Sequence, residues 1–295
     1  MAPVVRPRRS MLFMPGSNIR AMTKAKTLPA DGLIFDLEDA VAPAAKATAR
    51  QQVCEMVQAG GYGQRELVVR VNALTTPWGR DDLRAATRSG VDALLIPKVE
   101  SGVTVHRIAE LMVEDGAPDT MGLWCMLETP RGILRAEEIA TAHERVTALV
   151  MGTSDLTKEL RARHTPDRHP LLASLGYCLL VARAHGLVAL DGVHLDLNDD
   201  AGFALACQQA AEMGFDGKTL IHPKTLALAN AAFAPSADEV AWSRRIMAAH
   251  AKAMAQGQGV VLVEGQLIEG LHVENAQRVV QVAEAIAALE VPTTA

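Results

Sequence analysis

The sequence predicts an α/β fold of the (β/α)8 type, a TIM barrel, with a C-terminal hairpin and helix added as a lid. Eight short β-type runs recur along the chain, and segments of helical periodicity lie between them. The β-type runs are continuously apolar, which is typical of parallel strands covered on both faces. A doubly wound open sheet is the alternative fold. The stretch "MPGSN" after the first strand argues against it, because one glycine is too few for a dinucleotide-binding fingerprint.

The expected elements alternate as a barrel requires. We expect strands at residues 10–15, 32–38, 67–72, 93–99, 123–128, 148–153, 188–193 and 218–223. We expect helices at residues 43–59, 80–89, 103–115, 135–142, 171–185, 201–213 and 223–232. Because side chains alternate along a strand, Asp36 and Glu38 share one face of the second strand, and Arg70 and Asn72 share one face of the third.

A further segment follows the eighth strand. A helix is expected at 236–256, and residues 257–291 contain two short β-type runs around Glu264 and Gly265, followed by a closing helix. We therefore expect a catalytic barrel domain at 1–234 and a C-terminal helix and lid or oligomerisation segment at 235–295. Because a barrel does not need such an appendage, a homo-oligomer is expected, a trimer or a multiple of it.

The composition excludes several classes of protein. The chain has 295 residues, 49% of them hydrophobic, and a net charge of −5 with no long basic run, which argues against a nucleic-acid partner. No apolar stretch reaches about 18 residues, so no membrane span is expected. The N-terminus has no signal-peptide cleavage pattern, and the four cysteines are far apart in the sequence. A cytoplasmic protein with reduced thiols is expected.

Polar residues follow most of the predicted strands, at the end of a barrel where active sites lie. They are Asp36, Glu38, Asp39, Arg70, Asn72, Lys98, Glu128, Asp155, Asp191 and His222. Acids without clustered His or Cys favour a hard cation such as Mg²⁺, which takes one or two carboxylates plus waters and substrate oxygens. Glu128 and Asp155 are the best direct ligands, and Glu38 and Asp39 would hold metal-bound waters.

Each candidate also has a structural alternative. Asp155 or Ser154 would serve as the N-cap of a helix in "GTSDLTKEL". Arg70 is either a fork for a carboxylate or enolate oxygen, or a barrel-filling ion pair with one of the acids. Arg20 and Lys24, one helical turn apart after the first strand, are either a solvated face or a phosphate contact.

The chain resembles the CitE-like group, which comprises the citrate lyase β-subunit and the malyl-CoA and citramalyl-CoA lyases. The HpcH/HpaI aldolases are more distant members of the same superfamily. The stretches that carry the resemblance are "RSMLFMPGSNIRAMTKA", "GLIFDLEDAVAP", "VVRVN", "ALLIPKVES", "LETPRGIL", "MGTSDLTKEL" and "GFDGKTLIHP". They cover nearly the whole chain, and "FDLEDAV", "LETPRGI" and "GTSDL" in this order are highly specific.

The resemblance implies a Mg²⁺-dependent carbon–carbon lyase. It would cleave a 3-hydroxyacyl-CoA of the citramalyl, malyl or citryl type to acetyl-CoA and a 2-oxo acid by retro-Claisen chemistry. The family's metal ligands fall on Glu128 and Asp155, with Glu38 and Asp39 behind them. The substrate arginine falls on Arg70. The remaining contacts fall on Arg20 and Lys24 for CoA, and on the backbone N–H groups near Thr153 and Ser154 for a carboxylate.

The lid differs from the family pattern. The family lid reads like "DG-x-M-V-D-A-P", and its second Asp is a general acid/base that reaches into a neighbouring subunit's site. This chain has "EGQLIEGL", which places Glu269 at that position. Two alternatives to a stand-alone lyase stay open. One is a citrate lyase β-subunit acting on a carrier-protein-bound citryl thioester, and the other is a malyl-CoA thioesterase or malate-synthase-like enzyme.

Overall fold

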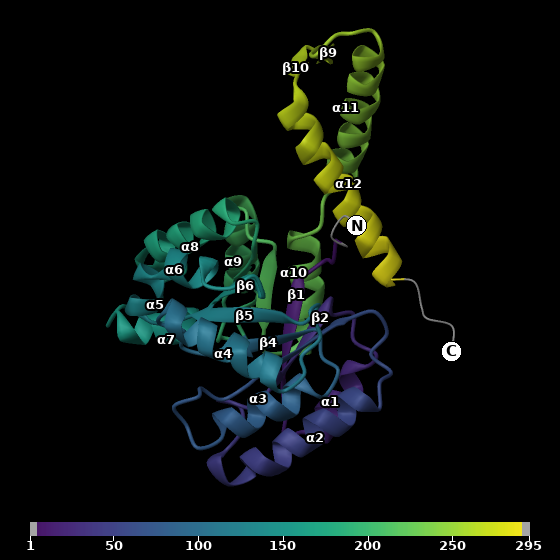
Figure 1. Cartoon of the computed structure of the whole chain (residues 1–295). Helices are drawn as coiled ribbons and strands as arrows, with labels where there is room; N and C mark the ends of the chain where they lie inside the picture. The colour runs from purple at the N-terminus through teal and green to yellow at the C-terminus, as the bar shows by residue number, and fades with distance from the viewer. Residues whose placement is uncertain (1–4, 291–295) are drawn as a thin grey trace. The chain divides into compact units, whose positions relative to one another are not determined.

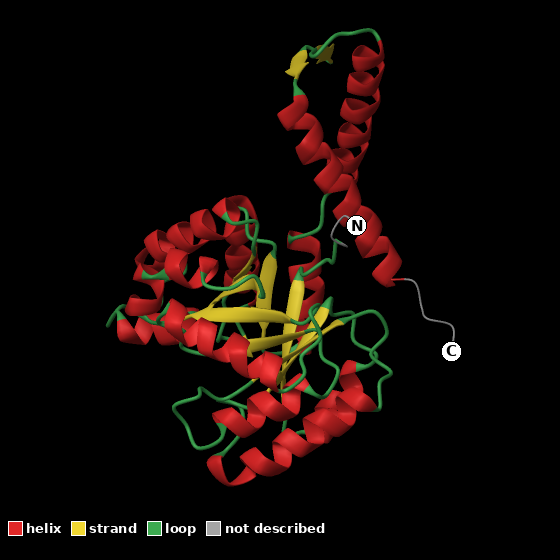
Figure 2. Ribbon diagram, viewed as in Figure 1, coloured by secondary structure: helices red, strands yellow, loops and turns green. Residues whose placement is uncertain are grey.

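Eight parallel strands close into a barrel in the order of the sequence, and the last strand pairs back to the first (Figures 1 and 2). The computed structural model describes residues 5–290. The strands are β1 (Ser10–Pro15), β2 (Gly32–Asp36), β3 (Glu66–Arg70), β4 (Ala93–Ile96), β5 (Gly122–Leu127), β6 (Val146–Met151), β7 (Val188–Asp191) and β8 (Gly217–Leu220). The predicted TIM barrel is confirmed, and the open-sheet alternative is wrong.

Helices connect the strands and surround the barrel (Figure 2). They are α1 (Ile19–Ala25), α2 (Lys46–Gln58), α3 (Gly79–Thr87), α4 (Gly102–Glu114), α5 (Pro130–Leu134), α6 (Ala136–Thr141), α7 (Thr153–Glu159), α8 (Leu172–Ala184), α9 (Asp200–Met213) and α10 (Leu226–Ala232), with short 3₁₀ turns before α2, α8 and α10. Most predicted strands extend further than the observed ones. The difference arises because their last polar residues leave the sheet and form the loops at the barrel mouth.

The alternation of side chains along the strands produces two apolar layers. One set of residues fills the barrel interior, and it comprises Met11, Ile34, Val68, Ala93, Leu95, Trp124, Met126, Ala148, Val150 and Leu190. The intervening residues, such as Leu33, Phe35 and Val69, belong to the larger cluster that includes the buried helix residues. The interior face of β2 and β3 therefore continues directly into Asp36 and Arg70, which are paired in register at the ends of these strands.

Residues 234–290, together with the described residues 5–7, form a second compact unit. Helix α11 (Ala237–Ala255) begins with a capping box between Ser236 and Glu239. It is followed by β9 (Val261–Val263), β10 (Gln266–Ile268) and α12 (Gly270–Glu290). Ile246, Ile268 and Ala276 form the buried centre of this unit.

The predicted hairpin is present, because β9 and β10 pair antiparallel around a two-residue turn. Glu264 and Gly265 in this turn have φ angles of +51° and +84°, as a type I′ turn requires. The role of this unit as a lid or an oligomer contact stays a prediction. Within the part of the chain that the structure describes, no helix is long and apolar enough to cross a membrane.

Candidate active site

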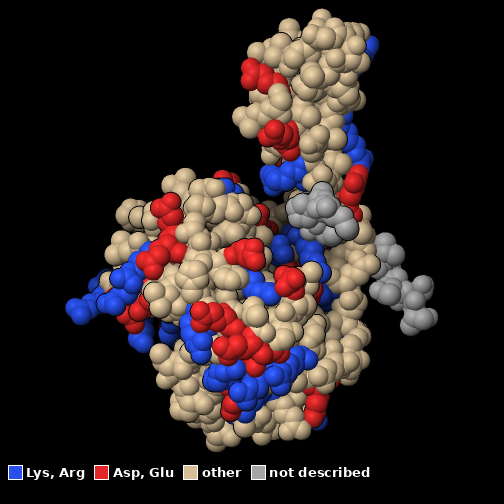
Figure 3. Space-filling view, in the orientation of Figure 1, with Lys and Arg blue, Asp and Glu red and all other residues tan. Residues whose placement is uncertain are grey.

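A cavity of about 430 Å³ lies at the carboxyl ends of the barrel strands. Its lining comprises Phe13, Pro15, Asp36, Asp39, Ala40, Arg70, Met126, Glu128, Met151, Gly152, Thr153, Ser154, Asp155, Val193, Leu195 and Ile221. Four acids line this cavity and Glu38 lies beside them, and we call Asp36, Glu38, Asp39, Glu128 and Asp155 the carboxylate cluster. Outside this site, acidic and basic side chains are intermixed on the face drawn in Figure 3.

Asp36 and Arg70 form the fixed base of the cluster. Arg70 Nε and Nη2 donate to the two carboxylate oxygens of Asp36 at 2.7 Å each, and both residues are buried. The Arg70 guanidinium also lies over the Phe13 ring, 4.7 Å from its centroid. Burial alone would raise the pKa of Asp36, but the hydrogen bonds and charge of Arg70 hold it below its usual value. The ion-pair alternative for Arg70 is therefore present in the structure.

Asp36 also shapes the turn that presents the next two acids. Its carboxylate accepts the backbone N–H groups of Glu38 and Ala40 at 2.9 and 3.0 Å. This turn sends Glu38 inward, where its side chain is 12% exposed, and leaves Asp39 65% exposed. Two neighbouring carboxylates thus occupy different environments, one partly desolvated and one open to water.

Glu38 Oε2 lies 3.0 Å from Arg70 Nη1, the guanidinium nitrogen that Asp36 does not occupy. This buried oxygen receives no hydrogen bond of normal geometry among the described residues. Burial raises the pKa of Glu38, although Arg70 and Lys98 oppose the shift. A carboxylate oxygen with unused acceptor capacity indicates a place for a further donor or cation.

Glu128 follows β5 and is buried, with a side chain that accepts the backbone N–H of Lys98 at 2.7 Å. Burial raises the pKa of Glu128 to about 7. Gly152 makes room for this carboxyl group. A Cβ at position 152 would lie 2.3 Å from Glu128 Cβ and 2.5 Å from its Oε2, closer than any real contact. The sequence "MGTSDL" therefore needs its glycine for the sake of Glu128.

Asp155 lies in the first turn of α7, with a side chain that is 31% exposed. The alternative that Asp155 or Ser154 caps this helix is wrong, because the N-cap is Gly152 and no side chain makes the capping hydrogen bond. The carboxylate instead lies 3.3 Å from Lys98 Nζ. Asp155 is thus available to the cluster rather than to the backbone of its own helix.

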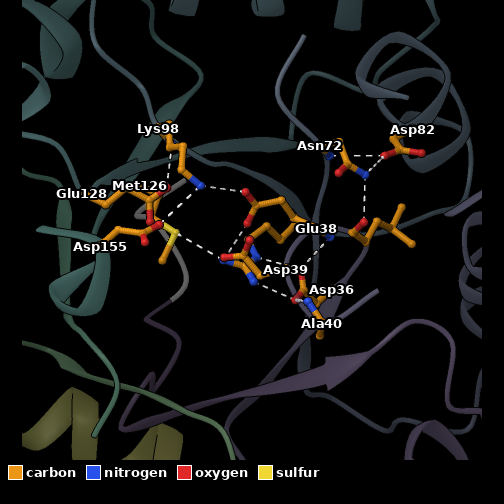
Figure 4. A network of polar contacts seen from close by, with 12 residues as sticks. Asp36, Glu38, Asp39, Ala40, Asn72, Asp82, Lys98, Met126, Glu128 and Asp155 are labelled. Carbon is orange, nitrogen blue, oxygen red and sulfur yellow. Dashed lines mark hydrogen bonds and ion pairs between the residues drawn. The ribbon is translucent and has the colours of Figure 1, made fainter. Parts of the chain in front are cut away.

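Lys98 links three members of the cluster (Figure 4). Its ammonium contacts Glu38 Oε1 at 2.9 Å and Asp155 Oδ2 at 3.3 Å, and its backbone N–H donates to Glu128. Burial would lower the pKa of Lys98, but the hydrogen bond and charge of Glu38 outweigh it and raise the pKa above its usual range. The sequence places Lys98 at a strand end but gives no sign of these contacts.

Lys46 is a residue of the site that the sequence analysis did not name. It is buried, and its ammonium donates to Leu37 O at 2.8 Å, Glu38 O at 2.7 Å and Asn72 Oδ1 at 2.8 Å. It thereby anchors the backbone that carries Glu38. Asn72 is held in turn by Asp82, and Figure 4 shows this pair beside the cluster. The lysine in "APAAKATAR" is an ordinary helix residue by pattern, so no local signal reveals this role.

The cluster suits Mg²⁺ better than a metal that needs a complete protein cage. Five carboxyl groups gather around two cations, Arg70 and Lys98, which leaves an excess of negative charge. Among the described residues no group of three or more His, Cys, Asp and Glu side chains is arranged to hold a metal ion by itself. Mg²⁺ keeps several waters and takes only one or two carboxylates, so Glu128 and Asp155 with substrate oxygens fit its needs.

The other predicted site residues are distributed unevenly. Thr153 and Ser154 line the cavity at the start of α7. Arg20 and Lys24 are exposed on α1 and do not line it. Glu269 belongs to the C-terminal unit, where it is exposed between β10 and α12. The structure therefore brings Arg70, Glu38, Asp39, Glu128 and Asp155 together with Thr153 and Ser154, while Arg20 and Lys24 lie outside the lining of this cavity.

Comparison with known proteins gives three related findings. The sequence signature described as HpcH/HpaI aldolase/citrate lyase matches residues 9–223. The chain is 48% identical to (3S)-malyl-CoA thioesterase of Cereibacter sphaeroides strain KD131 over 98% of this chain and 99% of that protein. It is 39% identical to citrate lyase subunit beta of Escherichia coli K12, over 95% of this chain and 94% of that protein.

A solved structure is also similar over most of the chain. It is the protein CitE from Mycobacterium tuberculosis in complex with magnesium, acetoacetate and coenzyme A. The TM-score is 0.74 at 30% identity, and the likeness covers 95% of this chain and 100% of that chain.

Proposed function

The chain belongs to the HpcH/HpaI aldolase/citrate lyase family, and from this premise we propose that it hydrolyses a 3-hydroxyacyl-CoA of the malyl type to a hydroxy acid and CoA. The observation that carries this proposal is the likeness to a (3S)-malyl-CoA thioesterase over nearly the full length of both chains. The lid sequence "EGQLIEGL" departs from the family pattern at the position of the acid/base that the lyase reaction uses, where this chain has Glu269. The leading interpretation of the motifs, a carbon–carbon lyase, becomes the second candidate.

Mg²⁺ is the proposed cofactor, and the related protein CitE was solved with magnesium. Glu128 and Asp155 would hold it directly, and Glu38 and Asp39 would hold its waters. When bound, Mg²⁺ supplies a Lewis acid that neutralises charge on substrate oxygens. The excess of carboxylates over cations in the cluster supports this assignment.

Arg70 and Glu38 are proposed to carry the hydrolytic step. Arg70 Nη1 would stabilise the negative charge that develops on the thioester carbonyl oxygen when water attacks its carbon. Glu38, 3.0 Å from that nitrogen, would accept the proton of the attacking water. When the C–S bond breaks, Glu38 would return this proton to the CoA sulfur. Arg20 and Lys24 are proposed to contact CoA, and the backbone N–H groups of Thr153 and Ser154 a substrate carboxylate.

The lyase remains the second candidate because the same cluster suits it. In that reaction a carboxylate of the cluster would take the proton of the 3-hydroxyl group as the C–C bond breaks, which releases a 2-oxo acid and leaves a thioester enolate that Arg70 would stabilise. Glu269 from a neighbouring copy would then protonate the enolate to give acetyl-CoA. The 39% identity to citrate lyase subunit beta favours this chemistry, and in a carrier-dependent form the same cleavage would act on a citryl thioester bound to a carrier protein in place of CoA.

Product analysis with (3S)-malyl-CoA separates these candidates. Purified protein with Mg²⁺ should release CoA thiol and malate in equal amounts, with no glyoxylate. A thiol reagent follows CoA, and phenylhydrazine follows glyoxylate. Glyoxylate and acetyl-CoA without free thiol would establish the lyase instead. Activity only after addition of a carrier protein would point to a citrate lyase β-subunit.

A further inference from the structure

Lys98 contacts three members of the carboxylate cluster, two through its ammonium and one through its backbone N–H. Its ammonium lies 2.9 Å from Glu38 and 3.3 Å from Asp155, while its amide nitrogen lies 2.7 Å from Glu128. Two of these acids, Glu128 and Asp155, are the proposed metal ligands. The Lys98 ammonium therefore binds one proposed metal ligand, Asp155, and Glu38 beside it, while the backbone N–H of the same residue binds the other ligand, Glu128.

The backbone at Lys98 is in an unusual conformation. Its φ angle is +50°, in the left-handed region that residues with a Cβ rarely adopt. The adjacent contacts hold this conformation, because Lys98 N donates to Glu128 and Val99 N donates to Met126 O at 3.3 Å. A strained residue with fixed neighbours directs its side chain reproducibly. Here it directs the ammonium onto Glu38 and Asp155.

The two cations of the cluster differ in their freedom to move. The Arg70 side chain is 9% exposed, pairs with Asp36 through two hydrogen bonds, and packs on Phe13. The Lys98 side chain is 43% exposed and makes single contacts to its carboxylates. A lysine also has four rotatable side-chain bonds and a well-hydrated head group. Arg70 is a fixed part of the site, whereas Lys98 is able to leave.

We propose that the Lys98 ammonium is an exchangeable counter-ion, which neutralises Glu38 and Asp155 in the cation-free protein and gives way when a divalent cation binds. This inference rests on the metal site of the proposed function. Because the ammonium and the cation use the same carboxylate, each weakens the binding of the other. Lys98 thereby sets the affinity of the site for Mg²⁺ and prevents strong repulsion among the acids before the metal arrives.

Direct measurement of Mg²⁺ binding tests this competition without any substrate. Full-length protein treated with EDTA and dialysed is titrated with Mg²⁺ by calorimetry, and with Mn²⁺ by electron paramagnetic resonance. Lys98→Met keeps an unbranched side chain and the same backbone strain but removes the charge. This variant should bind Mg²⁺ about tenfold more tightly than the wild type. Lys98→Arg, which keeps the charge, should stay within about twofold of the wild type.

Two controls make the result specific. Lys158→Met removes an exposed charge from α7, close in sequence to Asp155, and Lys158 forms no ion pair among residues 5–290. It should leave the affinity unchanged. Thermal unfolding in EDTA provides the second check, because Lys98→Met should have a lower Tm than the wild type and should gain more from Mg²⁺.

The rate of reductive methylation at Lys98, followed by mass spectrometry, reports the displacement itself. In the wild type it should rise when Mg²⁺ is added. Unchanged or weaker Mg²⁺ binding by Lys98→Met would overturn the inference. A methylation rate at Lys98 that is the same with and without Mg²⁺ would also overturn it. If the wild type binds Mg²⁺ but Asp155→Asn binds it equally well, the metal site of the proposed function is wrong. Loss of binding in Asp155→Asn with no effect of Lys98→Met leaves that site standing and removes only the role of Lys98.

Discussion

At the scale of single residues, Arg70 combines a structural and a chemical contribution. Two of its nitrogens are used by Asp36, and the third, Nη1, faces Glu38. The ion pair with Asp36 therefore does not exclude a catalytic role of Arg70, because it orients Nη1 toward Glu38. An ammonium cannot reproduce this geometry, because it has no planar fork.

Arg70→Lys should consequently fold but lower kcat/KM by about 100-fold or more. Steady-state kinetics with (3S)-malyl-CoA checks this, with circular dichroism to verify the fold. Arg80→Lys is the matched control, since Arg80 pairs with the buried Asp115 on the outer helices. That variant should keep its activity. Wild-type kinetics in Arg70→Lys would reduce Arg70 to a barrel ion pair.

The proposed metal ligands are tested by their isosteric amides. Glu128→Gln and Asp155→Asn remove one negative oxygen each while they keep the size of the side chain. Each should abolish Mg²⁺ binding and activity and leave the barrel folded, since Mg²⁺ depends on few carboxylates. Calorimetry with Mg²⁺ and an activity assay with and without EDTA provide the measurements. Full activity in EDTA would reject a metal-dependent reaction.

Gly152 leaves the space that the Glu128 side chain occupies. In Gly152→Ala the new methyl group would overlap Glu128, so either Glu128 or the start of α7 must move. We expect at least a tenfold loss of activity and a cost of about 1–3 kcal/mol in the free energy of unfolding. Gly176→Ala on α8 is the control, because nothing lies within 4 Å of its added Cβ. It should keep full activity, and equal behaviour of the two variants would contradict the packing argument.

At the scale of elements, the sequence predicts the strands well, because burial on both faces and alternation leave direct traces in the pattern. The faces of β2 and β3 follow from alternation alone, and so does the inward position of Ile34, Asp36 and Arg70. The hairpin of the C-terminal unit is likewise predicted from the sequence, since Glu264 and Gly265 stand between two short β-type runs. The short helices α1, α5 and α7 are missing from the expected helix ranges, because they are too brief to show a clear period.

The candidate site is predictable only in part, and the reason is physical. Strand ends converge in a barrel, so the sequence locates Glu38, Glu128 and Asp155 at one rim. Contacts that depend on the backbone conformation of loops cannot be predicted from the pattern of apolar and polar residues. The positive φ of Lys98 and the three hydrogen bonds of Lys46 arise from tertiary structure, and both residues look like ordinary lysines in the chain.

At the scale of the whole molecule, the buried ion pair between β7 and β8 contributes to stability at acid pH. Asp191 and Lys218 are paired in register and fully buried on the helix-covered face of the sheet, and Arg168 adds a second cation at 2.7 Å from Asp191. Burial would raise the pKa of Asp191, but Lys218 and Arg168 hold it below its ordinary value of 3.8. Because the folded pKa is the lower one, ionised Asp191 stabilises the fold above that value, and this stabilisation is lost as the pH falls below it.

Asp191→Asn should lower the free energy of unfolding by about 3–5 kcal/mol at neutral pH, because Lys218 keeps a buried and poorly compensated charge. The difference from wild type should be constant above about pH 5 and shrink below about pH 4. Urea titrations followed by tryptophan fluorescence measure it, in a Trp242→Phe background so that the signal comes from the barrel. Asp36 is present in both proteins, so its contribution to the pH dependence of the free energy of unfolding cancels in the comparison. A difference that is independent of pH would contradict this assignment.

The assembly of the molecule gives the last prediction. The C-terminal unit is compact in its own right and presents exposed apolar side chains, among them Leu262, Leu267 and Leu271. Glu269 lies in the same segment and is exposed. If this unit serves the site of another copy, the protein is a homo-oligomer, and light scattering should report a trimer or a multiple of it. A monomer with full activity would rule out a shared site.

Mixing of inactive variants tests whether Glu269 acts in that site. If the reaction is the lyase cleavage, Glu269→Gln and Glu128→Gln should each release no glyoxylate alone, because one lacks the proposed acid/base and the other a metal ligand. After dissociation and joint reassembly, mixed oligomers contain some sites with both intact residues, so part of the activity should return. Glu269→Asp, mixed in the same way, should fall between wild type and Glu269→Gln, since a shorter side chain changes the reach by about 1.5 Å. Mixtures that stay inactive would mean that Glu269 and Glu128 do not meet across subunits. Full activity of Glu269→Gln alone would make the segment a cover without chemistry.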